Sequence, residues 1–250
     1  MKVGLEYEGV ILHHDKIITW NSIPEEQKKS IISLTGDPRP YDNYDCLAEL
    51  RTMPYQLTEN AAQDVQNILQ GLLERICKYT SAYKKNGYDI AWCEKKITND
   101  MHDDITKRMG AIERGGDDKF SGKDAKITWT LSEEGISFWK PKPVTTHLRG
   151  GGLHINISPV EDISKAALIA LALHTGMKEY TNYGKSIYRK SILFRQRNIE
   201  KERVMEYMSI GFPFNTPDSL VTLSTLIKHQ FHWCRAMVDT LYRIKGLVEK

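Results

Sequence analysis

The chain has 250 residues and a formal net charge of +3, with 40% hydrophobic and 27% charged residues. These values are typical of a folded domain that buries a sizeable core without disulfides or structural metals, and they give no reason to expect nucleic acid as a required partner. The four cysteines form no Cys-x-x-Cys pair, which argues against a zinc site or a disulfide framework and favours a cytoplasmic protein, without membrane association.

The first third of the chain predicts two strands, each followed by a helix. In chain order these are a strand over residues 2–12, a short helix over 23–33, a strand over 46–52 and a long helix over about 58–84. Thr58 is the expected N-cap of the long helix. The sequence Asp37-Pro38-Arg39-Pro40 is expected to break the chain between the first helix and the second strand.

The middle of the chain begins with a polar segment, residues 98–124, that is rich in glycine and aspartate. A loop of this length is usually functional, and we hypothesise that it closes over a site. Strands are expected at 126–131 and 152–158, and a helix at 162–180.

The last part of the chain opens with a basic segment, residues 183–203, which is expected to be irregular. A strand is predicted at 204–210, and Thr216-Pro217 is expected to open a final helix that ends near Leu247. We find no repeat or linker, so we expect one α+β domain over residues 1–250. The glycine-rich motifs of the βαβ nucleotide folds are absent from the sequence.

Two carboxylates stand out on the first predicted strand. Glu6 and Glu8 are two residues apart, so their side chains share one face of the strand. Neighbouring carboxylates repel each other unless they are solvated or cations lie between them. A metal site and a solvated strand face are both open interpretations.

Residues 149–158 read Arg-Gly-Gly-Gly-Leu-His-Ile-Asn-Ile-Ser and repeat the same design. His154, Asn156 and Ser158 are expected on one face of this strand, and the isoleucines on the other. The glycines would let a backbone or a phosphate approach closely. The alternative is a hydrogen-bonded histidine that follows a glycine turn.

Further polar candidates lie elsewhere in the chain. Glu49 shares a strand face with Arg51, and Glu206 lies on the predicted strand 204–210. Arginines suit phosphate because the guanidinium group makes paired, charge-assisted hydrogen bonds. The cationic candidates of the basic segment are Lys185, Arg189, Arg195, Arg197 and Arg203. A solvated basic loop, or a nucleic-acid-binding surface, is the alternative.

Four blocks together resemble the glutamine synthetase and γ-glutamylcysteine ligase superfamily. In length the chain is similar to its small carboxylate–amine ligases, the amidoligases of phages and bacteria. The blocks are residues 4–8 (Gly-Leu-Glu-Tyr-Glu), 45–51 (Asp-Cys-Leu-Ala-Glu-Leu-Arg), 149–156, and 183–185 through 206–207. The superfamily's last strand usually reads Glu-x-Arg, whereas this chain reads Glu206-Tyr207-Met208, so the arginine is either missing or supplied elsewhere, with Arg203 and Arg197 as candidates.

The resemblance implies a curved, mainly antiparallel sheet with helices on its outer face and a site on its concave face. ATP and two or three Mg²⁺ ions, with Mn²⁺ as an alternative, would bind there. The implied metal ligands are Glu6, Glu8, Glu49, His154 and Glu206. The implied catalytic arginines are Arg149, Arg189, Arg195 and Arg197. The implied cofactor-binding residues are Lys185, Arg203, Asn156 and Ser158.

The implied reaction is ATP-dependent formation of an amide bond. A small-molecule or peptide carboxylate would be phosphorylated, and an amine would then displace the phosphate. An oligomer is compatible with the resemblance, and a phage-encoded member would act in the host cytoplasm. The alternatives are a kinase of the same superfamily and a non-catalytic relic that binds ATP or metal, which Met208 favours.

Overall fold

The structure is a computed structural model that describes residues 1–42, 47–92, 95–96, 98–101, 103, 127–138, 148–149, 152–177, 192–199, 202–207 and 223–248. Within this part the chain forms a ten-stranded, open sheet with antiparallel pairing and five helices. This architecture confirms the expected α+β class.

The main sheet holds most of the strands. In chain order these are β1 (Lys2–His13), β2 (Lys16–Ile17), β3 (Leu47–Arg51), β4 (Tyr55–Gln56), β5 (Asp89–Ala91), β7 (Ile127–Ser132), β8 (Gly135–Phe138), β10 (Leu153–Ser158), β11 (Ile192–Ile199) and β12 (Glu202–Tyr207). A separate pair is formed by β6 (Lys95–Lys96) and β9 (Leu148–Arg149). The helices are η1 (Trp20–Ser22), α1 (Glu25–Thr35), α2 (Ala61–Lys85), α4 (Ile163–Gly176) and α6 (Leu223–Val248).

Strand β1 organises the sheet. Its first half pairs with β10, its middle with β3 and its far end with β5 and β2. Beyond β10 the sheet continues through β12, β11, β7 and β8. Segments that lie far apart in the sequence therefore become neighbours across β1, β10 and β12.

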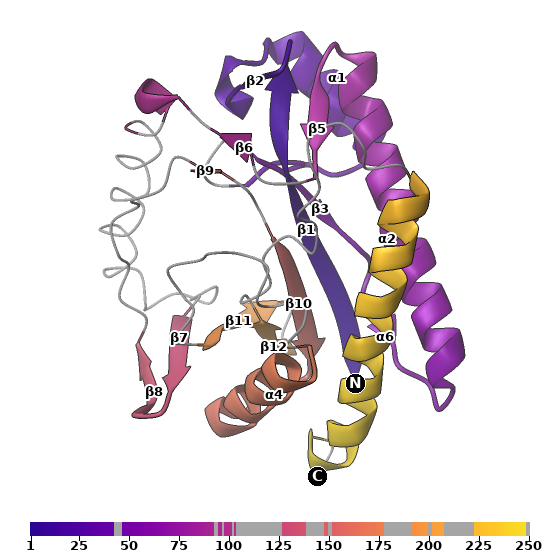
Figure 1. Cartoon of the computed structure of the whole chain (residues 1–250), viewed down its shortest axis with the longest axis vertical. Helices are drawn as coiled ribbons and strands as arrows, with labels where there is room; N and C mark the ends of the chain where they lie inside the picture. Colours follow the sequence, from indigo (N-terminus) through magenta and orange to yellow (C-terminus); the bar gives the residue numbers. More distant parts are fainter. Residues whose placement is uncertain are drawn as a thin grey trace.

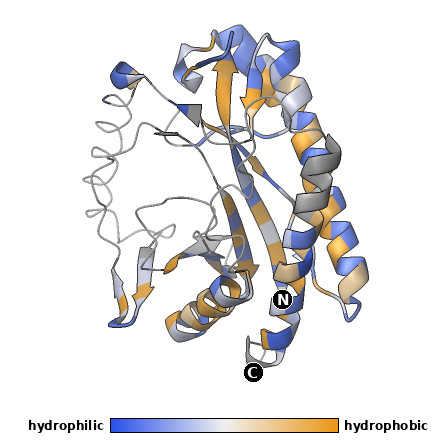
Figure 2. Cartoon of the chain, in the orientation of Figure 1, coloured by the Kyte–Doolittle hydropathy of each residue, from blue (hydrophilic) through white to orange (hydrophobic). Residues whose placement is uncertain are grey.

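The helices cover one face of this sheet. Helices α2 and α6 pack together beside β1 and β3, and α4 packs against β11 and β12 (Figure 1). The covered face is apolar because Leu5 and Tyr7 of β1 and Ile155 of β10 point into the core and are fully buried. Apolar residues recur along β1, α2 and α4 (Figure 2). Burial of one such side chain stabilises the fold by about 1.5–3 kcal/mol, which keeps apolar residues on the covered face. The polar residues are therefore expected on the opposite face.

Two predictions about local structure are wrong. Helix α2 begins at Ala61 with Asn60 as its N-cap, whose side chain accepts from the Gln63 amide at 3.2 Å. The expected cap, Thr58, instead donates its hydroxyl to Asp64 at 2.8 Å. The segment 183–203 was expected to be irregular, but it contains the regular strand β11.

Other predictions hold within the described residues or fall outside them. Helix α4 is capped by Asp162 and ends at Gly176, before the expected end at 180. The hypothetical lid, residues 98–124, lies almost wholly outside the described residues, as does the predicted opening of the last helix at Thr216. None of the described helices combines the length and the apolar character needed to cross a bilayer.

Helices α4 and α6 approach closely at Gly176. A Cβ atom there would lie 2.1 Å from Oγ1 of Thr240, whose hydroxyl donates to the Ala236 carbonyl at 2.7 Å. Gly176→Ala is therefore expected to destabilise the fold by about 1–3 kcal/mol in urea unfolding, because the helices must separate. The matched control is Gly71→Ala in α2, where the new Cβ meets nothing within 4 Å, and it is expected to stabilise by about 0.5–1 kcal/mol. Equal stability of Gly176→Ala and the wild type would contradict the close packing.

Candidate metal and nucleotide site

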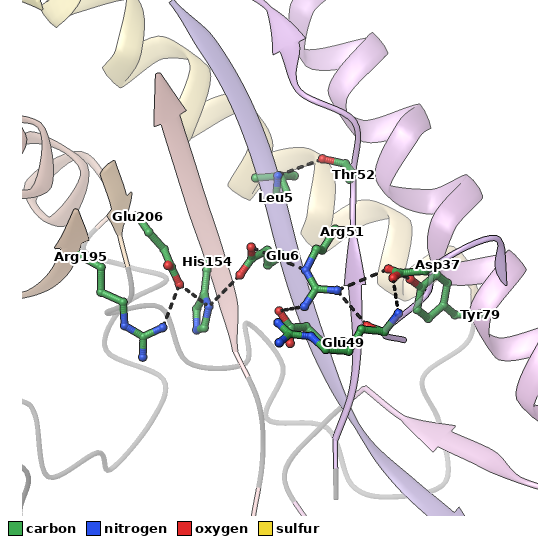
Figure 3. A network of polar contacts seen from close by, with 11 residues as sticks. Leu5, Glu6, Asp37, Glu49, Arg51, Thr52, Tyr79, His154, Arg195 and Glu206 are labelled. Carbon is green, nitrogen blue, oxygen red and sulfur yellow. Dashed lines mark hydrogen bonds and ion pairs between the residues drawn. The ribbon is translucent and has the colours of Figure 1, made fainter. Parts of the chain in front are cut away.

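Five adjacent strands place charged side chains in a row across the face that the helices leave uncovered (Figure 3). The strand register explains the row: on β1, Glu6 lies opposite Arg51 of β3 on one side and opposite His154 of β10 on the other. Glu206 of β12 lies opposite Arg195 of β11. We call these residues, with Glu8 and Glu49, the polar row: Glu49, Arg51, Glu8, Glu6, His154, Glu206 and Arg195.

The centre of the polar row is formed by Glu6, His154 and Glu206. The His154 Nδ1 atom lies 3.1 Å from Oε1 of Glu206 and 3.8 Å from Oε2 of Glu6. The three ligand atoms all lie within 4.8 Å of one another, and Glu206 is fully buried. Two ligands of one Mg²⁺ ion lie at most about 4.2 Å apart, so both histidine distances fit and a small closure of the two carboxylates would complete the site.

The electrostatics of the centre favour a positive charge there. Burial acts to lower the pKa of His154, but the negative charge of Glu8 and the contacts with Glu206 and Glu6 outweigh it and raise that pKa to about 10. The ring therefore carries a proton at neutral pH when no other cation is bound. A divalent cation could take over this role of the proton.

Glu49 responds to the same excess of negative charge. Burial raises its pKa to about 7, with smaller contributions from Glu6 and Glu8, while Arg51 acts in the opposite direction. Glu49 and Glu8 lie opposite each other on β3 and β1. The carboxylates of this face outnumber its two described arginines, which favours the uptake of a proton or another cation.

Arg51 forms one end of the polar row. Its Nη2 atom lies 2.6 Å from Oε1 of Glu49, and Nε lies 3.9 Å from Oε1 of Glu6. On its other side, Nη1 lies 3.4 Å from Oδ2 of Asp37 and donates to the Arg39 carbonyl at 2.9 Å. The Tyr79 hydroxyl donates to the same Asp37 oxygen at 2.5 Å. The guanidinium is therefore held from two directions.

Arg195 forms the other end. Its Nη1 atom lies 3.3 Å from Oε1 of Glu206, the same oxygen that contacts His154. Since Glu206 is fully buried, these two contacts fix its carboxylate toward the centre.

The remaining predicted residues divide into three groups. Asn156 belongs to the uncovered face, opposite Gly4 and Glu206, and Ser158 lies farther along β10, opposite Lys2. Arg203 does not join the row: it alternates onto the other side of β12 and donates to the Glu161 carbonyl at 2.7 Å. It therefore does not supply the arginine that Met208 replaces.

For the third group the structure describes the backbone alone or does not describe the residue. Arg149 pairs with Lys95 in the small sheet, and Arg197 of β11 lies opposite Val204 of β12. The side chains of both arginines, and the whole of Lys185, Arg189 and Met208, lie outside the described residues.

Two residues of the polar network were not predicted from the sequence. Asp37 was interpreted as part of a chain break, and Tyr79 as one more residue of the long helix. Asp37 contacts both Tyr79 and Arg51, and so joins the segment after α1 to the C-terminal half of α2 and to β3. A buried tyrosine at helical spacing carries no signal of a polar partner, so only the structure reveals it.

Comparisons of the chain with protein-family models, with curated proteins and with solved structures find no match. The geometry of the polar row and the sequence blocks themselves are thus the grounds for a functional proposal.

Proposed function

We propose that this protein is an ATP- and Mg²⁺-dependent ligase that joins a carboxylate to an amine. The observation that carries the proposal is the convergence of Glu6, His154 and Glu206, from three strands, on one point within 4.8 Å. Carboxylate oxygens suit Mg²⁺ and Mn²⁺, and an imidazole ligand is compatible with either. The nucleotide and the amide-forming reaction rest on the resemblance of the sequence blocks.

Each residue of the row has a role in this proposal. Glu6, His154 and Glu206 would hold the cation, and Arg195 would keep Glu206 oriented through its 3.3 Å contact. When bound, Mg²⁺ neutralises the phosphate charge that builds up during phosphoryl transfer. Glu8 lies beside these ligands on the same strand face and adds negative charge that attracts the ion.

The test is phosphate release from ATP across paired acids and amines, with the masses of the products measured. We expect release that requires Mg²⁺, an acid and an amine together, and a product whose mass is the sum of acid and amine less one water. Chelation of the metal is expected to stop the reaction.

The alternatives give different results in the same assay. Phosphate transfer to an acceptor without any amine would identify a kinase. Mg²⁺-dependent ATP binding without turnover over the whole screen would identify a non-catalytic relic. A chain that binds no divalent cation would exclude the ligase and both alternatives that use this site.

A further inference from the structure

The Arg51 guanidinium lies where a second cation would lie in a two-ion site. Glu6 turns one carboxylate oxygen, Oε2, toward His154 at 3.8 Å and the other, Oε1, toward Arg51 at 3.9 Å. A carboxylate that faces a cation on each side is how neighbouring ions are bridged in two-metal sites. On this side the other partner of Arg51 is Glu49, at 2.6 Å.

Arg51 is built into this position. Its Nη1 atom is held by Asp37 and by the Arg39 carbonyl, and Asp37 is itself held by the Tyr79 hydroxyl (Figure 3). These contacts direct Nε toward Glu6 and Nη2 toward Glu49. For the side chain to leave, Asp37 would lose a charged partner and the Arg39 carbonyl its donor, and both losses oppose the movement.

The position beside Arg51 already holds a positive charge. A second divalent ion would have to share Glu6 and Glu49 with a guanidinium that lies 3.9 Å from one carboxylate and 2.6 Å from the other. Two cations at this range repel each other, so the geometry favours a single ion.

We propose that Arg51 takes the place of a second divalent cation, so that this face binds one ion, at Glu6, His154 and Glu206. The inference rests on the cation site of the proposed function but does not require catalysis. It departs from the two or three ions that the sequence resemblance implies. In this protein a fixed guanidinium supplies, at the Glu49 end of the row, the positive charge that a mobile ion would otherwise bring.

The experiment counts Mn²⁺ ions bound per chain, by the electron paramagnetic resonance signal of free Mn²⁺ during titration without nucleotide. We expect one ion in the wild type and two in Arg51→Met, which keeps the unbranched apolar stem of the side chain and removes its charged end. Glu49→Gln in the Arg51→Met background is expected to return the count to one. Arg51→Lys, which keeps a positive charge, is expected to stay at one.

Thermal unfolding gives a second readout. Arg51→Met removes the positive charge beside Glu6, Glu49 and Asp37, so Mn²⁺ is expected to raise its unfolding midpoint more than that of the wild type. Two ions in the wild type, or one in Arg51→Met, would overturn the inference while leaving the proposed cation site in place. No bound ion in the wild type would instead contradict the proposed site. Failure of Arg51→Met to fold at saturating Mn²⁺ would also overturn the inference, because the ion is expected to replace the lost charge.

Discussion

His154→Ala is expected to lower Mg²⁺-dependent ATP turnover by about 100-fold or more while the protein remains folded. The imidazole Nδ1 atom lies 3.1 Å from Glu206 and 3.8 Å from Glu6, so its removal takes away the atom that joins the two carboxylates. A loss of 100-fold in kcat/KM corresponds to about 2.7 kcal/mol of transition-state stabilisation. The measurement is steady-state phosphate release at saturating Mg²⁺.

The matched control is His13→Ala. His13 is an exposed residue at the far end of the same β1 strand, so its removal is expected to leave turnover unchanged.

Glu8→Gln is expected to lower ATP turnover as His154→Ala does, because Glu8 is the largest source of negative charge acting on the imidazole. Circular dichroism and the unfolding midpoint in Mg²⁺ separate loss of the site from loss of the fold. Wild-type turnover in folded His154→Ala would remove the cation site from the proposal.

The alternation of side chains predicted which residues share a face. Glu6 and Glu8 on β1, and His154 and Asn156 on β10, lie on the uncovered face as the period of two requires. The same rule predicted that Arg51 and Glu49 share a face of β3, where they form an ion pair at 2.6 Å. The face to which a side chain points depends only on its position along the strand, so a single sequence is enough to predict it.

The pairing between strands is not local, and the sequence alone does not predict it. Glu6 meets His154 because β1 and β10 pair in one register, and a shift of one residue would turn every side chain of β10 to the other face. The resemblance suggested that these residues meet, but it gave neither the register nor the distances. It also gave no sign that Asp37 and Tyr79 would hold Arg51.

Strand β11 was missed for a physical reason. Its sequence begins with three buried apolar residues in succession, Ile192, Leu193 and Phe194, and then continues with arginines and other polar residues. The strand therefore shows neither the alternation of a half-buried strand nor the continuous apolar run of a fully buried one. The strand forms because β12 and β7 pair with it on both sides and satisfy its backbone groups. Tertiary pairing of this kind overrides local propensity, and a basic composition hides it.

Asp64→Asn is expected to lower the free energy of unfolding by about 2–3 kcal/mol. The Asp64 carboxylate is fully buried and joins three elements. It accepts from the Tyr55 hydroxyl at 3.0 Å, from the Thr58 amide at 3.0 Å and hydroxyl at 2.8 Å, and from the Tyr242 hydroxyl of α6 at 2.6 Å. Asparagine has one acceptor oxygen in place of two, and its amide group would face these donors with N–H groups. The measurement is urea unfolding at neutral pH.

The pH dependence of this effect separates the carboxylate from simple packing. Burial acts to raise the pKa of Asp64, but the hydrogen bonds from Tyr242, Thr58 and Tyr55 outweigh it and hold the pKa below its ordinary value of 3.8. Because the folded-state pKa is the lower one, the stabilisation is complete above the unfolded-state pKa and is lost as the pH falls through the folded-state value. The difference in stability between the wild type and Asp64→Asn is therefore expected to be constant near neutral pH and to shrink below about pH 4.

Asp239→Asn is the matched control. Asp239 lies on the surface of α6, where it pairs with Arg235 at 2.9 Å one helical turn away. An exposed pair of this kind is worth about 0.5 kcal/mol or less, so Asp239→Asn is expected to change stability very little at any pH. A stability difference for Asp64→Asn that stays the same from pH 7 to pH 3 would show that the donors around Asp64 do not bind an ionised carboxylate. In that case the junction of α2, α6 and β4 would depend on the shape of the side chain and not on its charge.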